Sequence, residues 1–260
     1  KYNDEYIVIK CGGSVLVNKN LFDNFINDIS ILNKLGFMPV VIHGGGKRIS
    51  NKLNEAGIKS DFINGLRVTD EKSIDIVVEV LNNFNKEITE ALKKNSCNSQ
   101  AITNNQNNIL MVEQEDQGLG FVGTPKKISQ SIIEQIVKEK KVPVIAPLGL
   151  DKNNQVFNIN ADTAAGAIAK KLNARRLIIM SDVEGVLDDK KKLISEINTD
   201  KINELIENNI ISGGMIPKIQ NCLDVASNGV KGVCIIDGRM NHSILFELLS
   251  NAGSGTLIRK

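Results

Sequence analysis

The sequence predicts an α/β fold built on a mainly parallel, open sheet. Short β-branched runs alternate with amphipathic stretches along most of the chain, which is the pattern of βαβ units. With 260 residues and 42% hydrophobic content, the chain can bury a sizeable core as one large domain or two joined lobes. Two glycine-rich turns, each placed after a predicted strand, indicate that the protein handles phosphate.

The first half of the chain carries the clearest periodicity. Residues 6–10 predict a strand, residues 21–32 a helix, and Met38–His43 a second strand. Thr69-Asp70 is typical of a helix cap, and the apolar positions that follow, up to Leu92, lie on one face of a long amphipathic helix. Residues 99–123 contain short alternating runs broken by asparagines and glycines, which predicts an antiparallel flap made of hairpins.

Regular alternation resumes after this flap. The further predicted elements are a helix over 129–140, a buried strand over 142–146, a helix over 161–172, a strand over 177–180, helices from about Lys201 and Pro217, and a strand over 233–236. Because the alternation restarts near Asn173, we expect an N-terminal lobe over 1–172 and a C-terminal lobe over 173–260, which share one continuous sheet.

Charge and aromatic content argue against nucleic acid and membrane as partners. Thirty-two basic and 30 acidic residues give a net charge of +2, without a basic stripe. Two tyrosines, eight phenylalanines and no tryptophan leave few rings for base stacking or a membrane belt. No apolar run approaches the roughly 20 residues that span a bilayer, and no signal peptide is visible at the start. We expect small-molecule partners and a cytoplasmic location.

The cysteines predict neither a metal site nor a disulfide scaffold. Cys11, Cys97, Cys222 and Cys234 form no C-x-x-C pair, and no histidine lies nearby at ligand spacing. We interpret them as reduced thiols.

The two glycine turns define a candidate phosphate crevice. Lys10 stands just before Gly12-Gly13-Ser14, and Gly44-Gly45-Gly46 leads into a predicted helix. Consecutive glycines let backbone N–H groups surround an anion, and a helix N-terminus adds a favourable dipole. Either turn alone is more often a simple strand-to-helix connection, whereas the pair together with Lys10 favours a functional site.

Two common nucleotide motifs do not apply. No G-x-x-x-x-G-K-[ST] segment occurs in the chain. The segment 118–123 matches G-x-G-x-x-G, but it precedes Thr124-Pro125 and does not open a helix, so we interpret its glycines as part of a hairpin.

Six motifs, in order, resemble the amino-acid kinase family. They are Lys10-Cys-Gly-Gly-Ser, His43-Gly-Gly-Gly, Gly65-Leu-Arg-Val-Thr-Asp, Asn158-Ile-Asn-Ala-Asp, Ser181-Asp-Val-Glu-Gly-Val-Leu and Gly213-Gly-Met-Ile-Pro-Lys. The resemblance covers nearly the whole chain and departs at Lys47, where a proline is frequent. The third and fourth motifs are similar to those of members that phosphorylate N-acetyl-L-glutamate. The resemblance implies a three-layer αβα sandwich, as in carbamate kinase.

The implied reaction transfers a phosphoryl group from ATP to the side-chain carboxylate of N-acetyl-L-glutamate, giving N-acetyl-L-glutamyl 5-phosphate, the second step of arginine biosynthesis. This acceptor is ionised at neutral pH, so no general base is needed, which agrees with the presence of only two histidines. The obstacle is repulsion between an anionic nucleophile and the triphosphate, which calls for cationic side chains around the transferring group.

The resemblance assigns the catalytic positions to Lys10, Lys218 and Asp162. Lys10 would hold the γ-phosphoryl oxygens, Lys218 would neutralise charge on the leaving group, and Asp162 would orient both ammonium groups. Without the motif order, the preferred interpretation would be solvated lysines and a helix-capping aspartate.

The acceptor site is assigned to the N-terminal lobe. Arg67 offers a fork for bidentate binding of the α-carboxylate, Asn158 offers amide hydrogen bonds to the acetamido group, and the amides of Gly44 and Gly45 complete the site. The alternative for Arg67 is a surface ion pair with Asp70.

Nucleotide binding is expected mainly in the C-terminal lobe. The residues that match the family motifs are Gly12, Gly13, Asp182, Gly185, Val186, Leu187, Gly213 and Met215. Mg²⁺ would arrive on the phosphates of ATP, with no direct protein ligand required. Asp188-Asp189 is interpreted as a charged hairpin tip, because three lysines follow it.

Several alternatives remain at this point. One methylene of acceptor length contributes only about 1–3 kcal/mol to discrimination, so a kinase for N-acetyl-aminoadipate stays open. Carbamate, aspartate and uridylate kinases are disfavoured by the Arg67 motif, and a non-catalytic acetylglutamate or nucleotide sensor is disfavoured by Lys10, Asp162 and Lys218. Family members commonly form dimers through the N-terminal lobe. The resemblance implies that arginine-inhibited members carry an extra N-terminal helix, which links dimers into a hexamer. Because the first strand is predicted to start at residue 6 of this sequence, which does not begin with Met, we expect no such helix and an arginine-insensitive homodimer.

Overall fold

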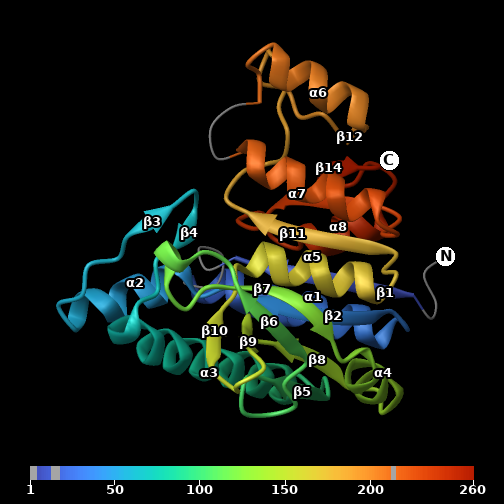
Figure 1. Cartoon of the computed structure of the whole chain (residues 1–260). Coiled ribbons are helices and arrows are strands. Elements are labelled where there is room, and N and C mark those ends of the chain that lie inside the picture. Colours follow the sequence, from blue (N-terminus) through green and yellow to red (C-terminus); the bar gives the residue numbers. More distant parts are fainter. Residues whose placement is uncertain (1–4, 13–17, 212–214) are drawn as a thin grey trace. The chain divides into compact units, whose positions relative to one another are not determined.

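A computed structural model describes residues 5–12, 18–211 and 215–260, with the side chain of Pro217 excepted. The chain divides into two compact units (Figure 1). Unit 1 contains residues 1–39 and 165–260, and unit 2 contains residues 40–164. The chain therefore leaves unit 1 once, builds unit 2 from one continuous segment, and returns.

Unit 1 has a largely parallel set of strands. In spatial order these are β12 (Glu196–Ile197), β14 (Gly255–Ile258), β13 (Val233–Asp237), β11 (Arg176–Ser181) and β1 (Tyr6–Cys11). β1 pairs in parallel with β11, and β11 in parallel with β13, while β14 runs antiparallel to β13. Its helices are α1 (Lys19–Lys34), α6 (Thr199–Glu207), α7 (Met215–Ser227), α8 (Ser243–Leu249) and most of α5 (Ala161–Lys171).

The central strands of unit 1 form its core because most of their side chains are apolar and buried on both faces of the sheet. All six residues of β11 are buried, and so are the first four of β13. Such continuous burial is what a parallel sheet covered by helices on both faces requires. The strand ends that emerge from this core are therefore fixed in place, and β1 and β11 end side by side.

Unit 2 contains three sets of strands. β2 (Met38–His43), β8 (Val142–Ile145) and β5 (Ser99–Ile102) are parallel, with β5 at the outer position. A second sheet has the order β10 (Val156–Asn158), β9 (Leu148–Leu150), β6 (Leu110–Gln114), β7 (Gly123–Ile128). β3 (Phe62–Ile63) and β4 (Leu66–Arg67) form a short hairpin. The helices are α2 (Gly46–Glu55), α3 (Glu71–Lys94) and α4 (Gln130–Lys138).

An apolar cluster fixes the beginning of α2 in unit 2. Ile49 and Leu53 of α2 pack with Val77 and Leu81 of α3, and with residues that follow β8. α3 begins at Glu71, where the Asp70 carboxylate accepts hydrogen bonds from the backbone N–H and the hydroxyl of Ser73. The glycine turn that precedes α2 is thus anchored on one side by β2 and on the other by this cluster.

Most predicted elements are confirmed, and one is wrong. The strand Met38–His43 and the helix capped at Asp70 occur as predicted, and 110–128 does form an antiparallel hairpin. Residues Ser99–Ile102, however, form a parallel strand against β8 and not part of that flap. The helices and strands that were not predicted are short, namely β3, β4, β9, β10, β12, β14 and α8.

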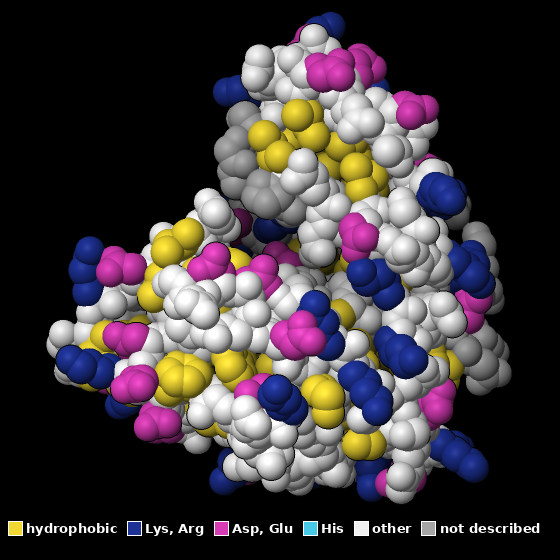
Figure 2. Space-filling view, viewed as in Figure 1, with side chains coloured by type: hydrophobic (Ala, Val, Ile, Leu, Met, Phe, Trp, Pro, Cys, Tyr) yellow, Lys and Arg dark blue, Asp and Glu magenta, His cyan; other side chains and the backbone are white. Residues whose placement is uncertain are grey.

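Figure 2 shows Lys and Arg side chains interspersed with Asp and Glu over the face in view, without a large area of one sign. This distribution agrees with the near-balanced charge of the sequence. Of the helices in the part of the chain that the structure describes, none combines the length and the hydropathy needed to cross a bilayer.

Candidate functional site

The glycine turn of unit 2 starts from a buried histidine. His43, the last residue of β2, is 0% exposed, and its Nε2 lies 3.1 Å from the amide nitrogen of Asn85 on α3. Burial lowers the pKa of His43 to about 4, so the ring is neutral at physiological pH. This histidine is a structural anchor for the turn.

Gly44 and Gly45 lead from this anchor into α2. Gly45 is the N-cap residue of α2, and a Cβ built on it would lie 2.8 Å from Leu81 Cδ2. A Cβ on Gly46 would meet nothing within 4 Å. Position 45 therefore requires glycine because the backbone there packs closely against α3. This packing keeps the first N–H groups of α2 near the end of β2.

Arg67 ends the β3–β4 hairpin with its guanidinium buried beside the same turn. The residue is 8% exposed. Its Nη2 donates to Gly46 O at 2.9 Å and to Ser50 Oγ at 3.0 Å, and its Nη1 donates to Ser60 Oγ. Its Cζ lies 4.7 Å from the centre of the Phe62 ring. Loop, hairpin and helix thus hold one guanidinium over the glycine turn.

The partners of Arg67 are all uncharged, so the alternative of a surface ion pair with Asp70 does not hold. Asp70, the candidate for a surface ion pair, instead caps α3. No carboxylate pairs with Arg67 among the described residues. Burial alone lowers the pKa of its guanidinium, although the group remains charged. A buried cation with only neutral partners is well suited to an anionic ligand.

Asn158 is connected to Arg67 through Thr69. The Asn158 side-chain amide donates to Thr69 Oγ1 at 3.2 Å, and Thr69 Oγ1 donates to the backbone carbonyl of Arg67 at 3.0 Å. Thr69 is 0% exposed. Gly120 approaches it so closely that a Cβ there would lie 2.3 Å from Thr69 O. The two predicted acceptor residues are therefore joined within unit 2 by one buried hydroxyl.

Unit 1 gathers a second group of predicted residues where β1 and β11 end. Lys10 pairs in register with Ile179, two residues before Ser181. Lys218 of α7 donates from Nζ to Ser181 Oγ at 2.8 Å, and Ser181 Oγ lies 3.3 Å from Asp182 Oδ1. Because the carboxyl ends of parallel strands in such sheets are where ligands bind, this end of unit 1 is the candidate phosphate site.

The loop after β11 is shaped by one threonine. Gly185 has φ +147°, and a Cβ there would lie 2.5 Å from Thr256 Oγ1. Val186 N donates to that same oxygen at 2.8 Å. The loop between Val186 and Ile194 then closes as a turn, where Asp188 Oδ1 accepts from the backbone of Lys190 and Lys192. The carboxylate of Asp188 thus supports the hairpin tip, as predicted.

Asp162 lies in the first turn of α5, but another residue caps that helix. Asn160 Oδ1 accepts hydrogen bonds from Asp162 N at 2.9 Å and from Thr163 N at 3.1 Å. The capping role that was the alternative for Asp162 therefore belongs to Asn160. The position of Asp162 remains compatible with a catalytic role, because the helix does not require its carboxylate as a cap.

Several residues of these sites are not predicted by the sequence. Ser50, Ser60 and Thr69 hold the acceptor residues, and Ser181 holds Lys218. Only Thr69 and Ser181 lie inside recognisable motifs, whereas the two serines that contact Arg67 carry no spacing signal. Of the predicted site residues, Gly13 and Gly213 lie outside the described residues.

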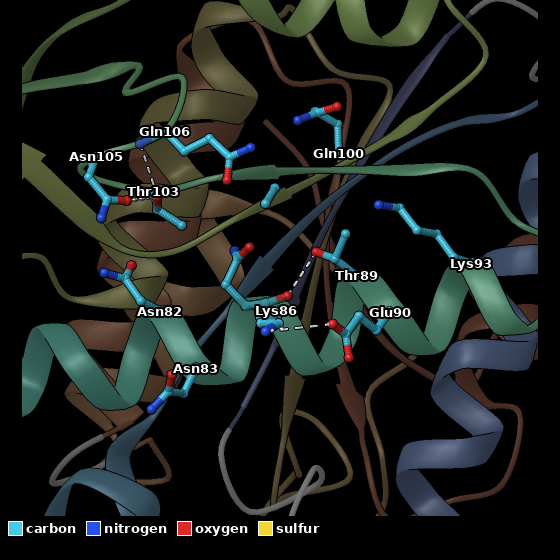
Figure 3. A pocket seen from close by; sticks show the side chains of 12 residues that line it. Asn82, Asn83, Lys86, Thr89, Glu90, Lys93, Gln100, Thr103, Asn105 and Gln106 are labelled. Atoms are coloured by element: carbon cyan, nitrogen blue, oxygen red, sulfur yellow. Dashed lines mark hydrogen bonds and ion pairs between the residues drawn. The ribbon is translucent and has the colours of Figure 1, made fainter.

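A separate polar cleft lies between α3 and β5 in unit 2. It has a volume of about 430 Å³, and amide and hydroxyl side chains such as Asn82, Gln100 and Thr103 line it (Figure 3). Asn85 also lines it and is 0% exposed, and its Oδ1 has no hydrogen-bond partner among the described residues. This surface is distinct from the glycine turn.

Comparison with known proteins gives consistent similarities. The model of the family described as "Amino acid kinase family" matches residues 5–237. The chain is 66% identical over 260 residues to an acetylglutamate kinase of Pelagibacter ubique, covering 100% of the chain and 90% of that protein. It is 43% identical over 261 residues to an acetylglutamate kinase of Campylobacter fetus, covering 100% and 93% respectively.

Solved structures agree with the fold. A protein of Streptococcus mutans aligns with a TM-score of 0.83 at 31% identity, covering 98% of both chains. A carbamate kinase of Giardia lamblia bound to AMP-PNP aligns with a TM-score of 0.70 at 17% identity, again covering 98% of both. The second likeness bears on the fold alone. Together they confirm the predicted α/β class with a mainly parallel sheet.

Proposed function

Because this chain belongs to the amino acid kinase family, we propose that it is an acetylglutamate kinase, which transfers the γ-phosphoryl group of ATP to the side-chain carboxylate of N-acetyl-L-glutamate. The reaction is a step of arginine biosynthesis. The observation that supports this acceptor most directly is the buried Arg67 guanidinium, which has only neutral partners beside the glycine turn. The high identity to curated acetylglutamate kinases supports the same substrate.

In this proposal unit 2 binds both ends of the acceptor molecule. Arg67 binds the α-carboxylate, and Asn158, held by Thr69, binds the acetamido group. The N–H groups at Gly44, Gly45 and the start of α2 face the reacting carboxylate, where a helix N-terminus stabilises negative charge. Binding three separate groups of the acceptor fixes the direction of its side chain toward the donor.

Phosphoryl transfer then depends on cations. Lys10 holds the γ-phosphoryl oxygens, and Lys218 neutralises the charge that develops on the leaving ADP. Asp162 orients the two ammonium groups. No residue removes a proton, because the attacking carboxylate is already ionised, and the neutral ring of His43 is used for structure.

ATP binds mainly to unit 1 in this proposal. The nucleotide-binding residues are Gly12, Gly13, Asp182, Gly185, Val186, Leu187, Gly213 and Met215. Support among the described ones comes from the loop that Thr256 shapes around Gly185 and Val186. Mg²⁺ enters on the ATP phosphates and supplies charge neutralisation there. The ammonium group of Lys218 donates a hydrogen bond to the neutral hydroxyl of Ser181. Because this partner does not neutralise the positive charge, Lys218 can still bind a phosphate.

We also propose a homodimer that uses the surface between α3 and β5. β5 is the outermost strand of its sheet in unit 2, and an open strand edge is a template for pairing with another chain. The amides of the adjacent cleft offer partners for a symmetric copy of themselves (Figure 3). The four cysteines are buried and form no disulfide among the described residues, which fits a reducing, cytoplasmic compartment.

One assay tests the proposed reaction. Purified protein with ATP, Mg²⁺ and N-acetyl-L-glutamate is expected to release ADP and to form an acyl phosphate that hydroxylamine traps. N-acetyl-aminoadipate serves as the matched acceptor with one more methylene, and a higher kcat/KM for it would reassign the substrate. Binding of ATP without either product would instead make the protein a sensor.

A further inference from the structure

The described contacts of Arg67 engage its two terminal nitrogens unequally. A guanidinium has five N–H donors, two on each Nη and one on Nε. Nη2 donates to two acceptors, Gly46 O at 2.9 Å and Ser50 Oγ at 3.0 Å, so both of its hydrogens are in use. Nη1 donates to Ser60 Oγ and retains one further N–H.

A carboxylate that binds Arg67 through two hydrogen bonds must use Nη2, although both N–H groups of Nη2 already have acceptors. Such a pair uses either one N–H from each Nη or the N–H of Nε together with the neighbouring Nη2. Both arrangements include Nη2, so one of its two acceptors must leave. Gly46 O belongs to the backbone of the first turn of α2 and cannot move without disturbing the helix. Ser50 Oγ is a hydroxyl that leaves by rotation about χ1.

We propose that Ser50 is a placeholder on Arg67, whose hydroxyl occupies Nη2 until the α-carboxylate of the acceptor replaces it. Ser60 is instead a positioning residue, because Nη1 can donate its second N–H to a carboxylate oxygen while Ser60 remains in place. The inference rests on the proposed function, since it takes the α-carboxylate as the ligand of Arg67.

The burial of Arg67 explains the use of a hydroxyl for this purpose. Because Arg67 is 8% exposed, an N–H of its guanidinium without an acceptor would destabilise the folded protein. A serine oxygen satisfies that donor without neutralising the positive charge, whereas an aspartate would form a permanent ion pair and compete with the acceptor. The enzyme thus keeps a stable cation that still attracts an anion.

The placeholder role predicts that removal of the Ser50 hydroxyl strengthens acceptor binding. In the Ser50→Ala variant the acceptor no longer displaces a hydrogen bond, so its Kd measured by calorimetry and its KM are expected to fall about threefold, with kcat unchanged. The thermal midpoint is expected to fall as well, because the buried Nη2 N–H loses its partner. Ser50→Thr retains a hydroxyl and is expected to match the parent protein.

Ser60→Ala is the matched control, because it removes the other hydroxyl from the same guanidinium. Its Kd and KM are expected to rise about fivefold, with recovery in Ser60→Thr. A second control uses 4-acetamidobutanoate, which is the acceptor without its α-carboxylate. The affinity for this compound is expected to be the same in the parent protein and in Ser50→Ala.

The outcomes separate the inference from the function on which it rests. Weaker acceptor binding in Ser50→Ala, or an equal change for 4-acetamidobutanoate, would overturn the placeholder role. Absence of acyl phosphate from the parent protein would overturn the proposed reaction, and calorimetry would still report whether Ser50 competes with the acceptor.

Discussion

At the residue scale, the proposed roles of Lys10 and Lys218 can be separated from simple binding. Arginine keeps the charge but changes the length and shape of the donor, so Lys10→Arg and Lys218→Arg should misplace charge around the transferring phosphoryl group. We expect kcat to fall by about 10²-fold and the acceptor KM to change by less than about threefold, measured by initial rates of ADP release. Lys126→Arg, an exposed lysine of β7, is the control. A change confined to KM would assign the lysines to binding.

His43 makes a separate prediction about pH. Its pKa is about 4 in the folded protein, below the ordinary 6.5, so the unfolded chain binds the proton more readily. The neutral ring therefore stabilises the fold above pH 6.5, and this contribution is lost as the pH falls toward 4. The loss amounts to about 3 kcal/mol, from the difference between the two pKa values.

Urea unfolding at pH 7 and pH 4 tests this effect. The free energy of unfolding of the parent protein is expected to fall by about 3 kcal/mol more than that of His43→Gln over the same interval. Burial raises the pKa of Asp28, which contacts His242 at 2.6 Å, but this pair is common to both proteins and cancels. Equal losses in the two proteins would mean that His43 is not held neutral by the fold.

At the element scale, the start of α2 distinguishes two adjacent glycines. Gly45→Ala brings a Cβ to 2.8 Å from Leu81 and 3.1 Å from Ile49, so we expect a loss of about 1–2 kcal/mol of stability and a higher acceptor KM. Gly46→Ala meets no atom within 4 Å, and alanine favours helix, so its stability should be equal or higher. Urea midpoints and acceptor kinetics of both variants make the comparison. Equal effects would show that packing against α3 does not set this turn.

The elements also show what the sequence could and could not predict. α3 and Met38–His43 were predictable because their apolar periodicity is long and a cap or a turn marks their ends. The asparagines after Ser99–Ile102 predict a hairpin, whereas the true partner is a distant strand, β8, with Ser99 opposite Val142. Local pattern does not contain that long-range pairing. For the same reason the motifs identified Arg67, but not the serines that contact it.

At the scale of the whole molecule, the dimer proposal predicts a mass. Light scattering should give about twice the 28.4 kDa of one chain. Ala101→Arg introduces a long cation into the cleft beside β5 and is expected to shift the protein to monomers, because an unpaired charge at an interface is strongly unfavourable. Lys152→Arg, in an exposed turn, is the control. A dimer that persists in Ala101→Arg would place the interface elsewhere.

The division of the chain into units has a consequence for the order in which the protein folds. Unit 2 is one continuous stretch, so all of its contacts become available once residue 164 has left the ribosome. Unit 1 must wait, because β1 pairs with β11, whose register joins Ile7 to Arg176. The loop that this pairing closes is long, and its closure costs entropy before any contact repays it. Vectorial synthesis therefore favours a unit 2 that matures first, while β1 remains without its partner β11 until that strand emerges from the ribosome.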